Sequence, residues 1–146
     1  MRRRKLLKDQ DRQKLFRVPT DEESLIRHYS LTSADRLEID LRRREHNRLG
    51  FAVQLCLMRH PGRVLAAGET PPRAMLKYVA DQVGADLGTF ALYARREETR
   101  RDHLITLRGV YGYRMFSGRG ARDLKDWLER EAETARSNQD LARQFI

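Results

Sequence analysis

The sequence lacks the residues and runs on which several classes of protein depend. It contains a single cysteine, Cys56, so an internal disulfide and a paired-cysteine metal site are both excluded. This cysteine stands inside the apolar run 51–58, where we expect a buried small hydrophobic residue. No stretch approaches the roughly 18 to 20 apolar residues that span a bilayer, and the N-terminus has no apolar signal core. The sequence therefore predicts a soluble cytoplasmic protein with no membrane partner.

Patterns typical of enzymes and metal sites are also missing. The four histidines are too far apart in sequence to form HxxxH or HExxH, and no GxxxxGK[ST], GxSxG or GxGxxG motif occurs. The acidic residues alternate with arginines at helical spacing, as in Glu97, Glu98, Arg100 and Arg101. This pattern is typical of surface ion pairs rather than of a catalytic carboxylate cluster. We therefore expect no enzymatic activity, no cofactor and no metal site in this chain.

Acidic residues are outnumbered, and lysine is scarce. Lys and Arg total 30 against 21 Asp and Glu, which gives a net charge of +9 and a pI near 10.3. Most of the cations are arginines, whose planar guanidinium group suits phosphates and guanine edges. A codon bias toward arginine would explain the ratio of arginine to lysine, but it does not by itself explain the net charge. The charge therefore predicts a polyanionic partner.

The spacing of the apolar residues predicts an all-α fold. The segment 48–59 is apolar on nearly every side, as expected for a central helix that is packed all round, and Pro61 and Gly62 end it. We expect a compact multi-helix bundle without β-sheet, whose short helices and tight turns are compatible with helix-turn-helix-like units. The predicted core residues of the central helix are Leu49, Phe51, Val53, Leu55, Cys56 and Leu57.

Capping and spacing patterns predict further helices around this segment. A basic arm at 2–5 leads into a short helix near 9–16, and another helix is expected at 73–83. Capping-box patterns predict helix starts at Thr20 with Glu23 and at Thr32 with Asp35. The helix after Thr32 carries Leu37 and Leu41 on one face, Thr89 opens an apolar segment, and the polar residues 95–103 begin a longer helix. The aromatic residues expected in the core are Tyr29, Tyr78, Tyr93, Tyr111 and Trp127.

A glycine-containing joint at 117–120 separates the last part of the chain. A charged helix follows it, with one apolar stripe. Ser137 with Asp140 resembles one more helix start, which leaves almost no helix before Ile146 and predicts that the chain is a fragment. We therefore divide the chain into a basic arm with the start of the first helix (1–14), a main helical domain (15–116) and a truncated helical extension (117–146). The predicted stripe consists of Ala121, Leu124, Trp127, Leu128, Ala132 and Ala135.

Four basic clusters are candidates for binding a polyanion. The arm 2–5 fits a solubilising terminus as well as a groove-following arm. The cluster 42–48 includes an asparagine that could read adenine or could cap a helix. The cluster 95–103 could place Arg96 with Arg100, or Arg101, on one solvent face, or could form a salt-bridged helix. The cluster 113–122 suits phosphates. The candidate DNA-binding residues are Arg42, Arg43, Arg44, Asn47, Arg48, Arg96, Arg100, Arg101, Arg114, Arg119 and Arg122.

Three stretches closely resemble one known family. They are RHYSL at 27–31, RLGFAVQLCLMRHPG at 48–62 and RREETRRDHLITLRGVYGYRMF at 95–116. Their order and wording resemble the N-terminal region of the TnpA transposases of replicative class II transposons, the Tn-three family. The resemblance runs from about residue 15 to residue 128, and the segment 47–56 is specific. The positions that match the family motifs are 48–50, His28, Tyr29, Arg96, Arg100, His103, Leu104, Tyr113 and Arg114.

The resemblance implies that this region binds the terminal inverted repeats of a transposon, as part of a transposase that performs replicative DNA transposition. In that family a distant RNase-H-like domain carries an acidic triad and binds divalent metal, so catalysis and metal are expected outside this chain. The implied partners are double-stranded DNA, the remainder of the transposase and a second transposase copy.

An alternative function is a protein-interaction or dimerisation module that organises two transposase copies in a synaptic complex. In that case the positive charge of the chain would be incidental. Arginines clustered on one exposed face would favour DNA binding, whereas a large exposed apolar patch would favour assembly.

Overall fold

A computed structural model describes residues 8, 10, 13, 16–113 and 119–144, with side chains left out at 119–120 and 137–144. The basic arm at 2–5 and most of the helix predicted near 9–16 lie outside the described residues. The part of the chain that is described contains helices and no strand, which confirms the all-α prediction. The elements are α2 (Glu22–Tyr29), α3 (Ser33–Asp40), α4 (Glu45–Arg59), α5 (Arg73–Val83), the short 3₁₀ helix η1 (Leu87–Thr89), α6 (Phe90–Ala94), α7 (Glu97–Tyr111) and α8 (Arg119–Gln144).

The chain divides into two compact units, residues 1–107 and residues 108–146. The first unit contains α2 to α6 and most of α7, and the second contains the end of α7 and α8. The boundaries predicted after residues 14 and 116 stay a prediction.

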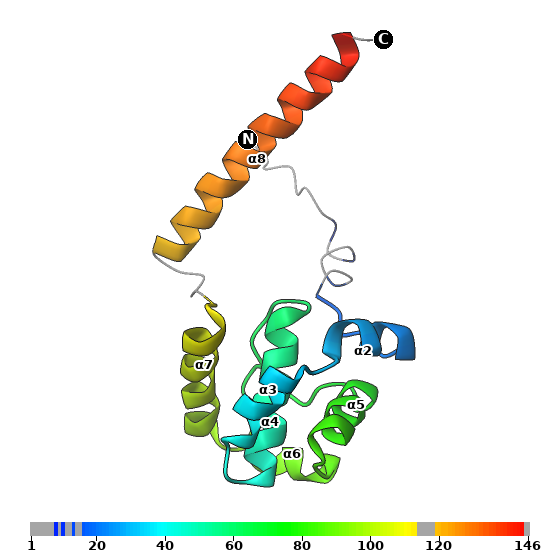
Figure 1. Cartoon of the computed structure of the whole chain (residues 1–146), viewed down its shortest axis with the longest axis vertical. Helices are drawn as coiled ribbons and strands as arrows, with labels where there is room; N and C mark the ends of the chain where they lie inside the picture. Colours follow the sequence, from blue (N-terminus) through cyan, green and yellow to red (C-terminus); the bar gives the residue numbers. More distant parts are fainter. Residues whose placement is uncertain (1–7, 9, 11–12, 14–15, 114–118, 145–146) are drawn as a thin grey trace. The chain divides into compact units, whose positions relative to one another are not determined.

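Helix α4 is the centre of the first unit. It contacts α2, α3, α5, α6 and η1, and it lies between α7 on one side and α5 on the other (Figure 1). Every residue from 49 to 57 is buried, including the predicted core residues Phe51, Val53 and Leu55. Burial raises the pKa of the Cys56 thiol to about 12, so this thiol is neutral at physiological pH. The prediction of a central helix packed on all sides is confirmed.

A glycine lets α6 approach α4 closely. A Cβ atom added at Gly50 would lie 2.3 Å from ring atoms of Tyr93, a distance that carbon atoms do not reach. The buried Tyr93 ring therefore packs directly against the backbone of α4 at Gly50. This contact explains why a residue that weakens helices stands inside the most buried helix of the molecule.

Two predicted helix starts had different outcomes. At α3 the Thr32 side chain accepts a hydrogen bond from Asp35 N, and the Asp35 carboxylate accepts one from Thr32 N, so this capping box is confirmed. At α2 the prediction was wrong, because Asp21 rather than Thr20 is the N-cap and accepts a hydrogen bond from Ser24 N at 3.0 Å. An aspartate is favoured at this position because its negative charge also stabilises the positive end of the helix dipole.

The face of α3 that packs against α4 contains a buried charged residue, Asp35. Leu37 and Leu41 are 70% and 66% exposed, whereas Asp35 and Ile39 are buried. The Asp35 carboxylate accepts two hydrogen bonds from the Arg59 guanidinium group at 2.6 and 2.7 Å. The leucine face is therefore not part of the core, since a bidentate ion pair occupies the contact between α3 and α4.

The remaining aromatic and cap predictions were partly right. Tyr29 and Tyr93 are fully buried, Tyr78 and Tyr111 are partly exposed, and Trp127 is 50% exposed, so placing Trp127 in the core was wrong. Helix α8 continues without interruption to Gln144, so no new helix begins at Ser137.

Candidate nucleic-acid interface

The turn between α3 and α4 presents arginines at the N-terminus of the central helix. Arg43 and Arg44 are exposed, and neither is within ion-pair distance of a carboxylate in the described part of the chain. Arg42 lies differently, because its guanidinium group is 4.8 Å from the centre of the Phe51 ring and is partly buried. Of these three predicted residues, the structure thus leaves two free for a ligand and uses the third in packing.

The next two predicted residues, Asn47 and Arg48, are partly buried at the start of α4. The Arg48 guanidinium group donates hydrogen bonds to the carbonyl oxygens of Arg42 and Arg43 at 3.3 and 3.2 Å. Asn47 lies in the first turn of α4, and its Oδ1 atom is enclosed without a hydrogen-bond partner among the described residues. Asn47 is not the helix cap, because Arg44 holds that position. Bidentate reading of adenine would require the Asn47 side chain to turn outward.

A second turn brings another exposed arginine to the same place. Arg96 lies between α6 and α7 and is exposed. Burial and then the charges of Arg96 and Arg44 lower the pKa of His46, and the neighbouring Glu45 carboxylate acts in the opposite direction. We call Arg43, Arg44, His46 and Arg96 the α4 cluster. The sequence stretch 42–48 contained His46, but nothing in it indicated that Arg96 would join from fifty residues away.

Arg100 was predicted on a solvent face, and this placement is wrong. Its side chain is buried, with 9% of the residue exposed, and donates a hydrogen bond to the carbonyl oxygen of Leu65. A Glu97 oxygen lies 3.6 Å from the same guanidinium group. The reason is geometric, since one turn of α7 places position 100 toward α4 while positions 97 and 101 face solvent. A contact between Arg100 and DNA stays untested, but it would need this side chain to leave the core.

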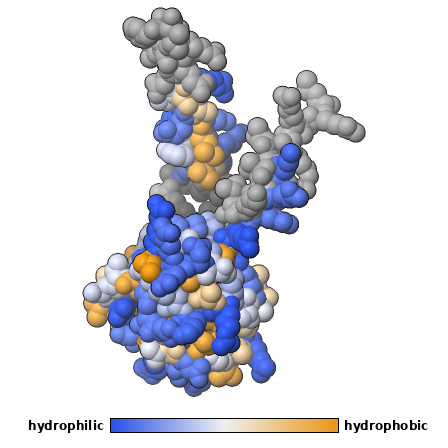
Figure 2. All heavy atoms as spheres, turned by 90° about the vertical axis from the view of Figure 1, so that its right-hand side faces the viewer, coloured by the Kyte–Doolittle hydropathy of each residue, from blue (hydrophilic) through white to orange (hydrophobic). Residues whose placement is uncertain are grey.

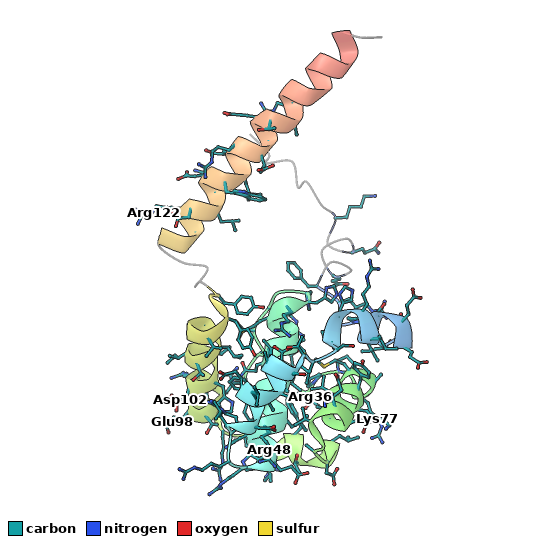
Figure 3. All side chains as sticks on the ribbon, in the orientation of Figure 1. Arg36, Arg48, Lys77, Glu98, Asp102 and Arg122 are labelled. Atoms are coloured by element: carbon teal, nitrogen blue, oxygen red, sulfur yellow. The ribbon has the colours of Figure 1, made fainter. Side chains whose placement is uncertain are left out.

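The outer face of α7 is mainly acidic. Arg101 is exposed as predicted, but its guanidinium group lies 3.0 Å from Glu97. Glu98 and Asp102 project from the same side of the helix (Figure 3). A shallow groove there is lined by Glu97, Glu98, Arg101, Asp102 and Ile105. This face is thus poorly suited to phosphate groups, and the predicted salt-bridged helix is confirmed at Glu97, Arg100 and Arg101.

Two residues of the family-like stretches, Gln54 and His103, form an internal polar network with Tyr93. Gln54 donates to the Tyr93 hydroxyl, which is 2.9 Å from His103 Nδ1. Burial is the main cause that lowers the pKa of His103 to about 4, with the charge of Arg42 as the second cause. His103 is therefore neutral at physiological pH, and its function in this network is structural.

A second histidine contact joins α2 to the end of α4. The rings of His28 and His60 are stacked with their centres 3.7 Å apart, and the Tyr29 hydroxyl donates to the His60 carbonyl oxygen at 2.9 Å. His60 is 31 positions from Tyr29 and 32 from His28, so the sequence spacing could not indicate the contact.

Three predicted residues belong to the cluster 113–122. Arg114 and the side chain of Arg119 lie outside the described residues. Arg122 is exposed near the start of α8 (Figure 3). The structure therefore neither supports nor opposes a binding surface formed by this cluster.

Two further observations concern metal ions and membranes. Within the described residues, no three His, Cys, Asp or Glu side chains are grouped so that they could hold a metal ion. None of the helices there combines the length and the apolar character that crossing a bilayer requires.

Comparison with known proteins identifies the relatives of this chain. Residues 6–146 match the family described as "Domain of unknown function (DUF4158)". The chain is 44% identical to the transposase for transposon Tn21 and 41% identical to that for transposon Tn3926, both from Escherichia coli, over 80% of its own length and 12% of theirs. It is 41% identical to the transposase for transposon Tn501 from Pseudomonas aeruginosa, over 74% of its own length and 11% of the relative's. The chain therefore belongs to the DUF4158 family, and its homologues are transposases of the Tn-three family.

Proposed function

We propose that this chain binds duplex DNA through the α4 cluster. The observation that carries the proposal is the convergence of exposed arginines from two separate turns around His46, where their charges outweigh that of Glu45. Among the described residues none of these arginines is within ion-pair distance of a carboxylate. Such unpaired guanidinium groups are suited to the evenly spaced phosphates of a duplex. Transposase homologues make DNA the natural polyanion for this surface.

The contact with DNA would be made by the turns before α4 and α7 rather than by a helix that lies in the major groove. Helices α3 and α4 are joined by a tight turn, as in a helix-turn-helix unit, but α4 is buried from 49 to 57 and offers only its first turn to a ligand. Phosphate contacts from Arg43, Arg44 and Arg96 would supply affinity, and any of these side chains that reaches a guanine edge would supply sequence selectivity.

Within a longer transposase, this region would recognise the terminal inverted repeats during replicative transposition. The catalytic step and its divalent metal would belong to parts of that protein outside this chain, and its site of action would be the bacterial cytoplasm. The chain spans only about 12% of the length of the relatives named above, so these statements about the whole protein belong to the proposal.

The test is a titration of labelled duplex at fixed salt with two charge-matched double variants. Arg44→Glu with Arg96→Glu reverses two charges in the α4 cluster, and Arg73→Glu with Lys77→Glu reverses two exposed charges on α5. We expect the first variant to lose most of its affinity and its salt dependence to fall by about 0.9 in slope for each phosphate contact that is lost. We expect the second variant to bind nearly as the natural protein does, and circular dichroism checks that both remain folded.

Two outcomes would contradict parts of the proposal. Equal loss of affinity in both variants would mean that net charge, and not the α4 cluster, governs binding. Equal affinity of the natural protein for terminal-repeat duplex and scrambled duplex would mean that this region holds DNA without recognising the repeat.

A further inference from the structure

Helix α8 presents an apolar stripe to solvent. Its members are spaced by three or four residues, which places them on one face of the helix. Leu124 and Leu128 are 38% and 52% exposed, and the apolar residues follow one another along the helix in Figure 2. Monomeric proteins rarely leave such a contiguous stripe uncovered. The stripe consists of Ala121, Leu124, Leu128, Ala132 and Ala135. Trp127, which the predicted stripe also included, is exposed but by helical spacing lies beside the stripe, one turn before Glu131.

The charges of α8 argue against DNA as the molecule that covers the stripe. The helix has as many acidic as basic residues, so the whole net charge of +9 lies elsewhere in the chain. One edge of the stripe carries Lys125 and Glu129, which line a shallow groove together with the apolar residues. The other edge carries Glu131, by the helical spacing of the sequence. Opposite charges along one edge are complementary to a second helix of the same sequence.

We propose that α8 pairs with α8 of a second copy of this chain, in antiparallel orientation about a two-fold axis near Leu128. This arrangement places Leu128 against Leu128 of the second copy and Leu124 against Ala132 of the second copy. Large and small side chains then alternate across the contact, which allows the two helices to approach closely. A two-fold pair uses the same surface on both copies and forms a closed dimer.

The edge charges select the antiparallel orientation. In an antiparallel pair the same edges of the two helices face each other, so Lys125 of each copy lies beside Glu129 of the other. In a parallel pair opposite edges face each other, so Glu129 of one copy would lie close to Glu131 of the other. The first arrangement forms two ion pairs, and the second brings carboxylates together. The dimer does not depend on DNA binding, because the α4 cluster lies on other helices.

The first experiment is sedimentation equilibrium of the complete chain at low salt, from micromolar to several hundred micromolar concentration. We expect a reversible equilibrium between monomer and dimer for the natural sequence. Leu128→Asp should abolish the dimer, because it places two carboxylates at the centre of the contact. Leu37→Asp is the control, since it alters a leucine of α3 that is also more than half exposed, 70% against 52% for Leu128, and should leave dimerisation unchanged.

The second experiment tests orientation by mixing two charge variants. Lys125→Glu and Glu129→Lys each place like charges at both ion-pair positions of a homodimer, and each should weaken dimerisation about tenfold. In an equimolar mixture, the antiparallel heterodimer regains two opposite-charge pairs and should form about as tightly as the natural dimer. Both variants lose the Lys125–Glu129 pair within their own helix, 4.0 Å in length, so helix stability cannot explain the recovery.

Three results would overturn the proposal. A natural chain that stays monomeric throughout the concentration range would mean that the stripe is covered by a different protein or by another part of a longer transposase. A dimer that persists in Leu128→Asp would place the contact elsewhere. Recovery that fails in the mixture would exclude the antiparallel orientation.

Discussion

The first unit and helix α8 use the same residue types in opposite ways. In the first unit the leucines of α4 are buried, and this unit carries most of the net positive charge of the chain. In α8 Leu124 and Leu128 are exposed and the charges cancel. The difference indicates two kinds of partner, an anionic one for the first unit and an apolar one for α8. Composition averaged over the whole chain combines these two regions and conceals the division.

The arginines of the two regions differ as well. In the first unit several guanidinium groups are used inside the protein, where Arg59 pairs with Asp35, Arg100 binds the Leu65 carbonyl oxygen and Arg48 holds the turn before α4. In α8 Arg122, Arg130 and Arg136 are exposed. The number of arginines therefore overstates the number available to DNA, because the more basic region also uses arginine for structure.

The largest effect on the free energy of unfolding should come from replacing a leucine of the first unit by alanine, compared with the same replacement in α8. Leu55→Ala removes a fully buried side chain from α4 and should lower the free energy of unfolding by about 2 to 5 kcal/mol. Leu128→Ala in α8 should change it by less than about 0.5 kcal/mol in dilute solution, where the chain is monomeric. Urea unfolding followed by circular dichroism measures both. Equal losses of stability in the two variants would contradict the statement that leucines are core residues in α4 but not in α8.

A slightly smaller effect is expected from the ion pair between α3 and α4. Arg59→Ala leaves the Asp35 carboxylate, which is 2% exposed, without its bidentate partner. We expect the free energy of unfolding to fall by about 3 kcal/mol, because a buried charge that loses its partner keeps its desolvation cost. The control is Lys125→Ala, which breaks an exposed pair in α8 and should have almost no effect. If Arg59→Ala were as mild as the control, the Asp35 carboxylate would have to be satisfied by its other contacts.

The stability of the first unit should also depend on pH, through the buried His103. The pKa of His103 is about 4 in the folded chain and ordinarily 6.5, so the unfolded chain takes up a proton first as the pH falls. The stability linked to His103 is therefore complete above pH 6.5 and declines by about 3 kcal/mol toward pH 4. His103→Gln should flatten this part of the profile of the natural protein. An unchanged slope would mean that the pKa of His103 is nearly the same in the folded and the unfolded chain.

The smallest effect is expected at the surface of the first unit. Lys77 and Asp81 form an exposed pair on α5 at 2.9 Å, with both side chains more than half exposed. Lys77→Ala should change the free energy of unfolding by less than about 0.5 kcal/mol, because solvent screens the pair. The same measurement with Arg59→Ala shows that burial, and not the presence of an ion pair, determines the effect. A loss above 1 kcal/mol would indicate a contact that the surface position of Lys77 does not suggest.

Parts of the fold could be predicted because their signals are local. The limits of α5 and the capping box at Thr32 follow from residues within one helical turn. The apolar run of α4 indicates a buried helix because no polar face is left for solvent. The cap at Asp21 and the exposure of Leu37 could not be predicted in this way, since both depend on how α2 and α3 pack against α4.

The candidate site was predicted only in part. Arg43, Arg44 and Arg96 are exposed as a basic cluster would require, but no local pattern distinguishes them from Arg42 and Arg100. That separation depends on the Phe51 ring and the Leu65 carbonyl oxygen, each reached only through the folded chain. Arg114 and Arg119 stay predictions.

The all-α class, the central helix and the family resemblance could be recognised from the order of neighbouring residues, and the excess of positive charge from the composition. The tertiary structure decided which arginines reach solvent, that Arg96 joins Arg44 around His46, and that Asp35 pairs with Arg59. The physical reason is that a side chain's exposure and partners are set by contacts between helices that are distant in sequence. Helix periodicity gives the direction of a side chain within its own helix but not what it meets there.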